Sequence, residues 1–101
     1  MKNKMDQPQQ QFRIRTPRKG EVLGLVTQLM GGARMLVQCQ DGKERMCRVP
    51  GKIKKNIWVM EGDYVIVAPW SVEPNEKGDI AYRYIKAQVE TLRRMGIIKN
   101  T

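Results

Sequence analysis

The stretch RMLVQCQDGKERMCRV, residues 34–49, holds two strand-like runs separated by Gln40-Asp41-Gly42, and it predicts a β-hairpin. A two-residue turn would place Glu44 and Arg48 on the face that carries the apolar residues of the first strand. A three-residue turn with a glycine bulge shifts the register by one residue, and we prefer it because it buries more apolar groups. In that register the inner face holds Met35, Val37, Cys39, Cys47 and Val49, with Lys43 and Arg45 at its margin, and the outer face holds Arg34, Leu36, Gln38, Glu44, Met46 and Arg48.

Short apolar runs lie on both sides of this hairpin, and turn signals separate them. EVLGLVTQL (21–29) precedes it, while NIWV (56–59), YVIVAPW (64–70) and IAYRYIKA (80–87) follow it. Several short strands at this spacing, with almost no helix between them, predict a mainly β protein that is a small barrel or sandwich. Val89, Leu92 and Met95 recur every three residues before Gly96, which predicts one short C-terminal helix that caps an end of the barrel.

The first twenty residues have a different character from the rest. They are polar, contain the tract QPQQQ and carry six basic residues against a single acid. Such a segment buries too little apolar surface to offset its ordering entropy, so it predicts a disordered basic arm, residues 1–20, ahead of one folded domain, residues 21–101. The arm residues expected to lie along a phosphate backbone are Arg13, Arg15, Arg18 and Lys19.

Charge is segregated along a chain whose formal net charge is +9. Residues 34–55 contain seven basic residues and two acids, whereas residues 57–79 contain one basic residue and five acids. A small domain with this balance typically meets phosphate, in nucleic acid or at an anionic membrane. The alternative is that the loop lysines are simply solvated. The predicted positive face has Lys52, Lys54 and Lys55 at its tip and Arg34, Arg45 and Arg48 on its floor.

Aromatic residues narrow the kind of nucleic acid. Proteins that hold single strands on small barrels usually stack bases on strand aromatics, and residues 34–49 contain none. Trp58 and Trp70 lie outside that hairpin, and we expect them in the core or at its rim. The sequence therefore favours structured RNA gripped through backbone and shape over a plain single strand.

Several classes of protein are excluded. The chain has no histidine, no Gly-rich phosphate loop and no metal-ligand spacing at Cys39 and Cys47, so we expect no enzyme, no metal and no cofactor. No run approaches the ~20 apolar residues of a membrane span, and MKNKMDQPQQQ is not a secretory signal. Two thiols in strand-like segments then indicate buried, reduced cysteines and a cytoplasmic protein.

Five motifs follow one another from about Arg15 to about Met95: RTPR, GEV, DGKERMCRVPGKIKKNIWV, EGDYVIVAPW and GDIAYRY. Their order resembles the translation initiation factor 1A family in its archaeal form. The pattern DG-x4-C-x-V-x-GK-x-x-K, followed by an apolar pair around a tryptophan, is far more specific than a small basic barrel.

The resemblance implies a five-stranded oligonucleotide-binding-type (S1-like) barrel with a short C-terminal helix. It implies a translation initiation factor that binds the small ribosomal subunit near the A site through rRNA contacts and assists initiator tRNA and mRNA placement. Other initiation factors are implied as partners, including the GTPase that promotes subunit joining, and we expect the chain itself to be a monomer. Eukaryotic members contact that GTPase through a long acidic C-terminal tail, which GIIKNT does not match.

Residue by residue, the three loop lysines match the family's basic loop, Trp58 matches the aromatic after it, and Arg34 matches the basic residue after the first hairpin's glycines. Arg45 and Arg48 occupy positions where the family is usually basic or polar. Two other functions stay open: a general single-stranded RNA-binding chaperone of cold-shock type, and an adaptor whose partner is an acidic protein, with Leu36 and Met46 as its contact.

Overall fold

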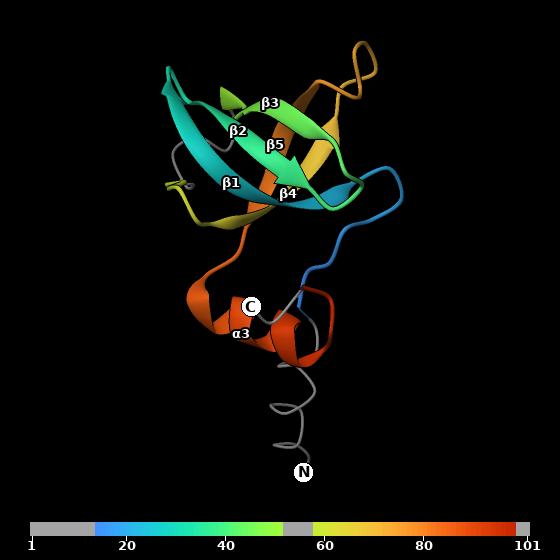
Figure 1. Ribbon diagram of the computed structural model, residues 1–101, viewed down its shortest axis with the longest axis vertical. Coiled ribbons are helices and arrows are strands. Elements are labelled where there is room, and N and C mark those ends of the chain that lie inside the picture. Colours follow the sequence, from blue (N-terminus) through green and yellow to red (C-terminus); the bar gives the residue numbers. More distant parts are fainter. Residues whose placement is uncertain (1–13, 52–57, 99–101) are drawn as a thin grey trace.

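Five strands close into a barrel in the computed structural model, which describes residues 14–51 and 58–98, and one helix lies outside it (Figure 1). Neighbouring strands follow the order β1-β2-β3-β5-β4, and β1 closes the ring by pairing with β4. Every pair is antiparallel except β3 with β5. The elements are β1 (Val22–Gly31), β2 (Arg34–Cys39), β3 (Glu44–Arg48), β4 (Tyr64–Pro69), β5 (Lys77–Arg83) and α3 (Lys86–Arg94). The predicted mainly β class with a short C-terminal helix is confirmed.

The hairpin of β2 and β3 has the register with the three-residue turn. Gln38 pairs with Glu44, and the Cys39 N–H donates to the Lys43 carbonyl across the turn. Gly42 sits at φ 87°, in the left-handed region that a glycine bulge requires. All five residues predicted for the inner face are buried, so this register is confirmed.

The barrel interior is filled by small and medium apolar side chains from all five strands. Two glycines, Gly24 and Gly78, let strands approach so closely that an added Cβ would lie 2.4 Å and 2.6 Å from valine methyl groups. Cys39 and Cys47 are both free and buried there, as predicted. Burial raises the pKa of the Cys47 thiol to about 12, which keeps it protonated and inert.

Helix α3 covers the outer surface of the barrel, so the prediction that it caps a barrel end is wrong. Leu23 of β1 and Ile66 of β4 are register partners, and each alternates with residues that point into the barrel. Both therefore point outward, where fully buried Leu92 of α3 packs with them. The complete buried cluster is Leu23, Ile66, Tyr84, Leu92 and Ile98.

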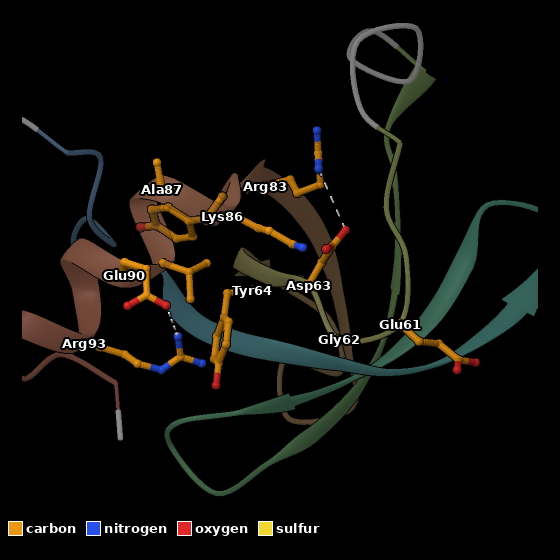
Figure 2. Close-up of a pocket in the computed structure, with 11 residues that line it drawn as sticks. Glu61, Gly62, Asp63, Tyr64, Arg83, Lys86, Ala87, Glu90 and Arg93 are labelled. Carbon is orange, nitrogen blue, oxygen red and sulfur yellow. Dashed lines mark hydrogen bonds and ion pairs between the residues drawn. The ribbon is translucent and has the colours of Figure 1, made fainter. Parts of the chain in front are cut away.

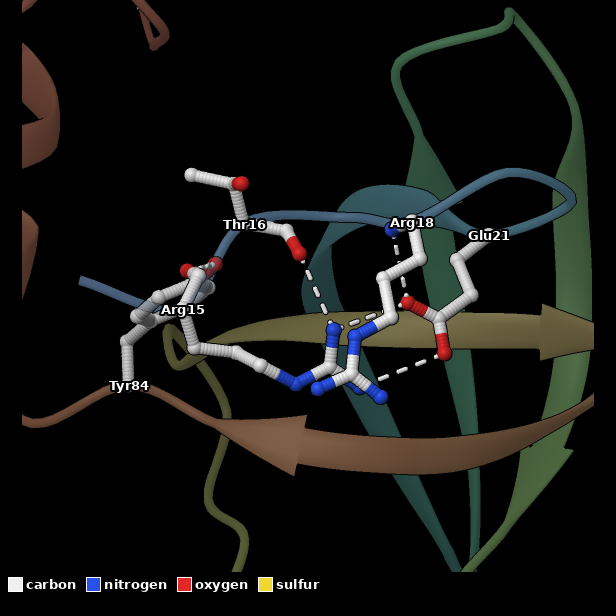
Figure 3. Close-up of polar contacts among 5 residues, drawn as sticks. All are labelled: Arg15, Thr16, Arg18, Glu21 and Tyr84. Atoms are coloured by element: carbon white, nitrogen blue, oxygen red, sulfur yellow. Dashed lines mark hydrogen bonds and ion pairs between the residues drawn. The ribbon is translucent and has the colours of Figure 1, made fainter. Parts of the chain in front are cut away.

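Ile14 and Arg15 pack onto this same side of the barrel. Ile14 contacts the outer cluster, and the Tyr84 hydroxyl donates to the Arg15 carbonyl. The Arg15 guanidinium forms two hydrogen bonds with the Glu21 carboxylate, at 2.9 Å and 3.2 Å (Figure 3). The part of the predicted free arm between residues 14 and 20 is thus fastened to the domain, while residues 1–13 lie outside the described residues.

Two strand boundaries differ from those predicted. Strand β5 begins at Lys77, earlier than Ile80, because β3 pairs with residues 77–79 in parallel and fixes them in the sheet. Residues 56–57 of NIWV lie outside the described residues, and Trp58 and Val59 belong to no strand. No helix within residues 14–51 and 58–98 is long and apolar enough to cross a bilayer.

Candidate nucleic-acid interface

Two arginines face each other on the outer surface of β2 and β3. Arg34 and Arg48 are register partners, and both side chains are exposed. Like charges directly opposite each other repel across a strand pair, so this pairing carries a cost that a bound anion would relieve. Among the described residues, Arg34 forms no ion pair, whereas Arg48 donates from Nε to Asp79 at 3.1 Å.

Trp58 lies beside Arg34 at the end of the barrel. Its ring is 78% exposed, and it lines an apolar hollow of about 400 Å³. Other side chains of that hollow are Leu29, Met35, Val49, Met60 and Arg34. A large exposed aromatic next to an arginine suits an unpaired base with its phosphate. Trp58 was expected to be a core or rim side chain rather than a stacking platform, and of this only the rim position agrees with its exposure.

Arg45 takes no part in the exposed face. Its side chain is 4% exposed, and its Nη atoms bond to the Asp41 carboxylate at 3.1 Å and 2.9 Å. Its Nε donates to the Pro74 carbonyl at 2.6 Å, which joins the β2–β3 turn to the β4–β5 loop. The hydrogen bonds with Asp41 raise the pKa of Arg45 and lower that of Asp41. The floor position predicted for Arg45 is corrected, because its inward register and these bonds bury the guanidinium.

The arm residues lie apart from this face. The Glu21 carboxylate holds the Arg15 guanidinium, which also rests over the Tyr82 ring, 5.9 Å from its centroid. Hydrogen bonding to Arg15 lowers the pKa of Glu21. Arg18 and Lys19 are exposed in the turn before β1. Arg13, Lys52, Lys54 and Lys55 lie outside the described residues.

A groove of about 760 Å³ separates α3 from β4 and β5 (Figure 2). Its charges are mixed and partly paired, with Arg93 bonded to Glu90 at 3.0 Å and Arg83 near Asp63 at 4.0 Å. A groove with such balanced charge does not select phosphate. Within the described ranges no group of three or more metal-ligating side chains comes together.

Sequence reasoning missed a cluster around Trp70. The indole Nε1–H donates to Asp79 at 2.8 Å, and the cationic groups of Arg48 and Lys77 lie 5.1 Å and 5.8 Å from the ring centroid. These residues come from β3, β5 and the end of β4, so no local motif could have shown them together. Lys77 as the lone base within an acidic stretch was the available signal.

Known proteins similar to this chain were found by sequence and by structure. The family model described as "Translation initiation factor 1A / IF-1" matches residues 9–101. Translation initiation factor 1A of Methanococcus maripaludis strain S2 is 50% identical over 100 residues, covering 97% of this chain and 96% of the relative. The protein of that name from Methanothermobacter thermautotrophicus strain Delta H is 47% identical over 93 residues, covering 92% and 94%.

A solved structure is similar as well. The solution structure of a translation initiation factor from the Wolbachia endosymbiont strain TRS of Brugia malayi superposes with a TM-score of 0.53. It is 31% identical in sequence, and the match covers 71% of this chain and 84% of that chain. The closed five-stranded barrel is therefore of the oligonucleotide-binding type. The chain belongs to the translation initiation factor 1A / IF-1 family.

Proposed function

We propose that this chain binds the small ribosomal subunit near the A site through rRNA contacts and assists the placement of initiator tRNA and mRNA. Family membership supports the role in initiation. The observation that carries the RNA contact is the facing pair of exposed arginines on the outer surface of β2 and β3. Arginine guanidinium groups bind phosphate oxygens in a fixed, two-pronged geometry, which suits a folded RNA backbone.

The proposed contact set combines described residues with the neighbouring loop. Arg34 and Arg48 bind phosphates, and Trp58 stacks on an unpaired base at the rim of the barrel. The loop lysines Lys52, Lys54 and Lys55 extend the contact, and Arg13, Arg18 and Lys19 add charge along the RNA. Arg15 and Arg45 are left out, because internal carboxylates and carbonyls already occupy their guanidinium groups.

A cold-shock type chaperone for single-stranded RNA is the second candidate. The exposed ring of Trp58 favours it, since such proteins stack bases on aromatics. The outer surface of β2 and β3 disfavours it, because Leu36 and Met46 stand where stacking rings would be needed. We therefore rank it behind the initiation factor.

The remaining parts of the proposal concern partners and setting. We propose a monomeric, cytoplasmic, non-enzymatic factor that acts beside other initiation factors. These include the GTPase that promotes subunit joining, whether or not the two proteins touch directly. The proposed RNA contacts do not depend on the oligomeric state, the location or the protein partners, so they can be tested separately.

The test is co-sedimentation of the chain with isolated small and large ribosomal subunits across a salt series. We expect saturable one-to-one binding to the small subunit alone, with an affinity that falls steeply as salt rises. Equal, unsaturable binding to both subunits would refute the proposal. Tight binding to short oligonucleotides regardless of sequence would favour the chaperone instead.

Charge reversal locates the contact on the chain. The pair Lys54→Glu and Lys55→Glu should flatten the slope of log affinity against log salt by about two, one unit for each lost phosphate contact. The matched control is Lys86→Glu with Arg94→Glu, which changes net charge equally on exposed positions of α3. Equal losses in both double variants would show that only total charge matters.

A further inference from the structure

We infer that the cluster around Trp70 extends the phosphate-binding face: Lys77 joins Arg48 in contacting the RNA backbone, while Trp70 and Asp79 act as positioning residues. The inference rests on the proposed function, since RNA supplies the phosphates. It adds Lys77 to the contact set and gives positioning roles to Trp70 and Asp79. Both belong to residues 57–79, an acidic stretch that would be expected to repel RNA.

Arg48 is held in place while its anion-binding atoms stay available. Its Nε donates to Asp79 Oδ1 at 3.1 Å, and the guanidinium carbon lies 5.1 Å from the centroid of the Trp70 ring. Its two Nη nitrogens donate to no other described residue, and the side chain is 58% exposed. An arginine fixed at its inner edge and open at its outer edge loses little freedom when it binds phosphate.

Asp79 is itself held by Trp70. The indole Nε1–H donates to the same Oδ1 atom at 2.8 Å, and Asp79 is the register partner of Arg48 across the parallel β3–β5 pair. Two hydrogen bonds therefore hold the Oδ1 atom of the carboxylate at one place on the sheet. Its position sets the orientation of Arg48.

Positive charge is in surplus around Trp70. Lys77 lies over the same ring at 5.8 Å, and Arg34 stands opposite Arg48 on β2. Arg48 and Lys77 thus share the Trp70 ring, and Arg34 lies one strand further on. An open hollow of about 450 Å³ borders the cluster and gives a ligand access to Arg48. Gathered cations with an open approach fit an extended polyanion.

Asp79 provides a test that depends on the sign of an effect. If Asp79 were only an acid near RNA, Asp79→Ala would remove a repulsive charge and tighten binding. If it positions Arg48, the same change should weaken binding to isolated small subunits by about threefold to tenfold, the factor expected for ordering one long side chain at an interface. Tighter binding of the variant would overturn the assignment.

A double-mutant cycle shows whether Asp79 acts through Arg48. In the background of Arg48→Gln, removal of the Asp79 carboxylate should no longer weaken binding, and the lost repulsion should strengthen it slightly. A general structural role for Asp79 would weaken binding in both backgrounds and would refute a positioning role. Thermal unfolding of each variant shows that the barrel is still formed.

Lys77 tests the site from a partly exposed position over the Trp70 ring. Lys77→Gln should flatten the salt slope for small subunits by about one, whereas Lys86→Gln on α3 should leave it unchanged. Equal salt slopes for Lys77→Gln and Lys86→Gln would overturn the inference. The cluster around Trp70 would then be assigned to the alternative partner, an acidic protein. If the wild-type chain itself bound both ribosomal subunits equally, the proposed function would be refuted instead, so the two failures can be told apart.

Discussion

Replacing Arg45 by methionine should destabilise the barrel without altering RNA binding, the opposite of what its charge alone would indicate. Methionine keeps an apolar stem of similar length in the buried position and removes every donor. Three hydrogen bonds are lost, one to the Pro74 carbonyl at 2.6 Å and two to the Asp41 carboxylate at 3.1 Å and 2.9 Å. The β2–β3 turn and the β4–β5 loop are then no longer joined.

The size of the stability loss in Arg45→Met depends on how Asp41 and Pro74 are solvated once the guanidinium is gone. The Asp41 side chain is 41% exposed, so water can solvate its carboxylate once Arg45 is gone. The Pro74 carbonyl loses a charge-assisted bond, which contributes roughly 1.5–3 kcal/mol in proteins. We expect a total loss of about 2–3 kcal/mol, most of it from the bond to Pro74, which is less than the roughly 3–5 kcal/mol lost on breaking a fully buried ion pair. For a domain of this size, that loss lowers the melting temperature by on the order of 10–20 °C.

Two measurements decide the matter, and Arg48→Gln serves as the matched variant. Urea unfolding should show the loss for Arg45→Met and little change for Arg48→Gln, whose side chain is 58% exposed. The salt slope of small-subunit binding should be unchanged for Arg45→Met and flatter by about one for Arg48→Gln. If Arg45→Met unfolds like the wild type and flattens the slope, our assignment of Arg45 to the barrel's internal bonds is refuted.

Two further predictions concern stability. The hydrogen bond from Arg15 holds the pKa of Glu21 below its ordinary value, so the stability that this pair contributes is present above the ordinary pKa and is lost as the pH falls through the lowered pKa. In urea unfolding at several acidic pH values, the Glu21→Gln variant should therefore lose less stability on acidification than the wild type does. A variant with the same pH profile as the wild type would contradict the pairing. Gly78→Ala should cost about 1–3 kcal/mol by overpacking, because the new Cβ would lie 2.6 Å from a Val67 methyl carbon; a thermal melt equal to the wild type would show that the strands can separate without cost.

Local sequence patterns predicted the β2–β3 hairpin correctly, but they could not predict its contacts with distant loops. The Asp41-Gly42 signal and the period-two alternation were sufficient to choose the register of β2 and β3, because turn geometry and the apolar face agree. The same alternation already placed Arg45 at the inner margin. Its burial could not be foreseen, since the Pro74 carbonyl that binds it comes from a loop 29 residues away.

Non-local pairing accounts for what the sequence did not reveal. The start of β5 and the cluster at Trp70 both depend on the parallel contact between β3 and β5, which no turn connects. The position of α3 depends on which side of β1 and β4 remains apolar after the barrel interior has been filled. The inner face of β1 and β4 is buried in the barrel, and Leu23 and Ile66 make their outer face apolar as well. Helix α3 packs on that outer face.

Ile14 and Ile98, near the two ends of the described chain, meet in the outer cluster on the helix side of the barrel. The β1–β2 turn, next to Arg34, lies at the other extremity of the molecule (Figure 1). The fold thus separates the places where sequence can be appended from the surface that carries the facing arginines. A segment that continues from Ile14 or Ile98 therefore leaves the barrel on the helix side, away from the facing arginines.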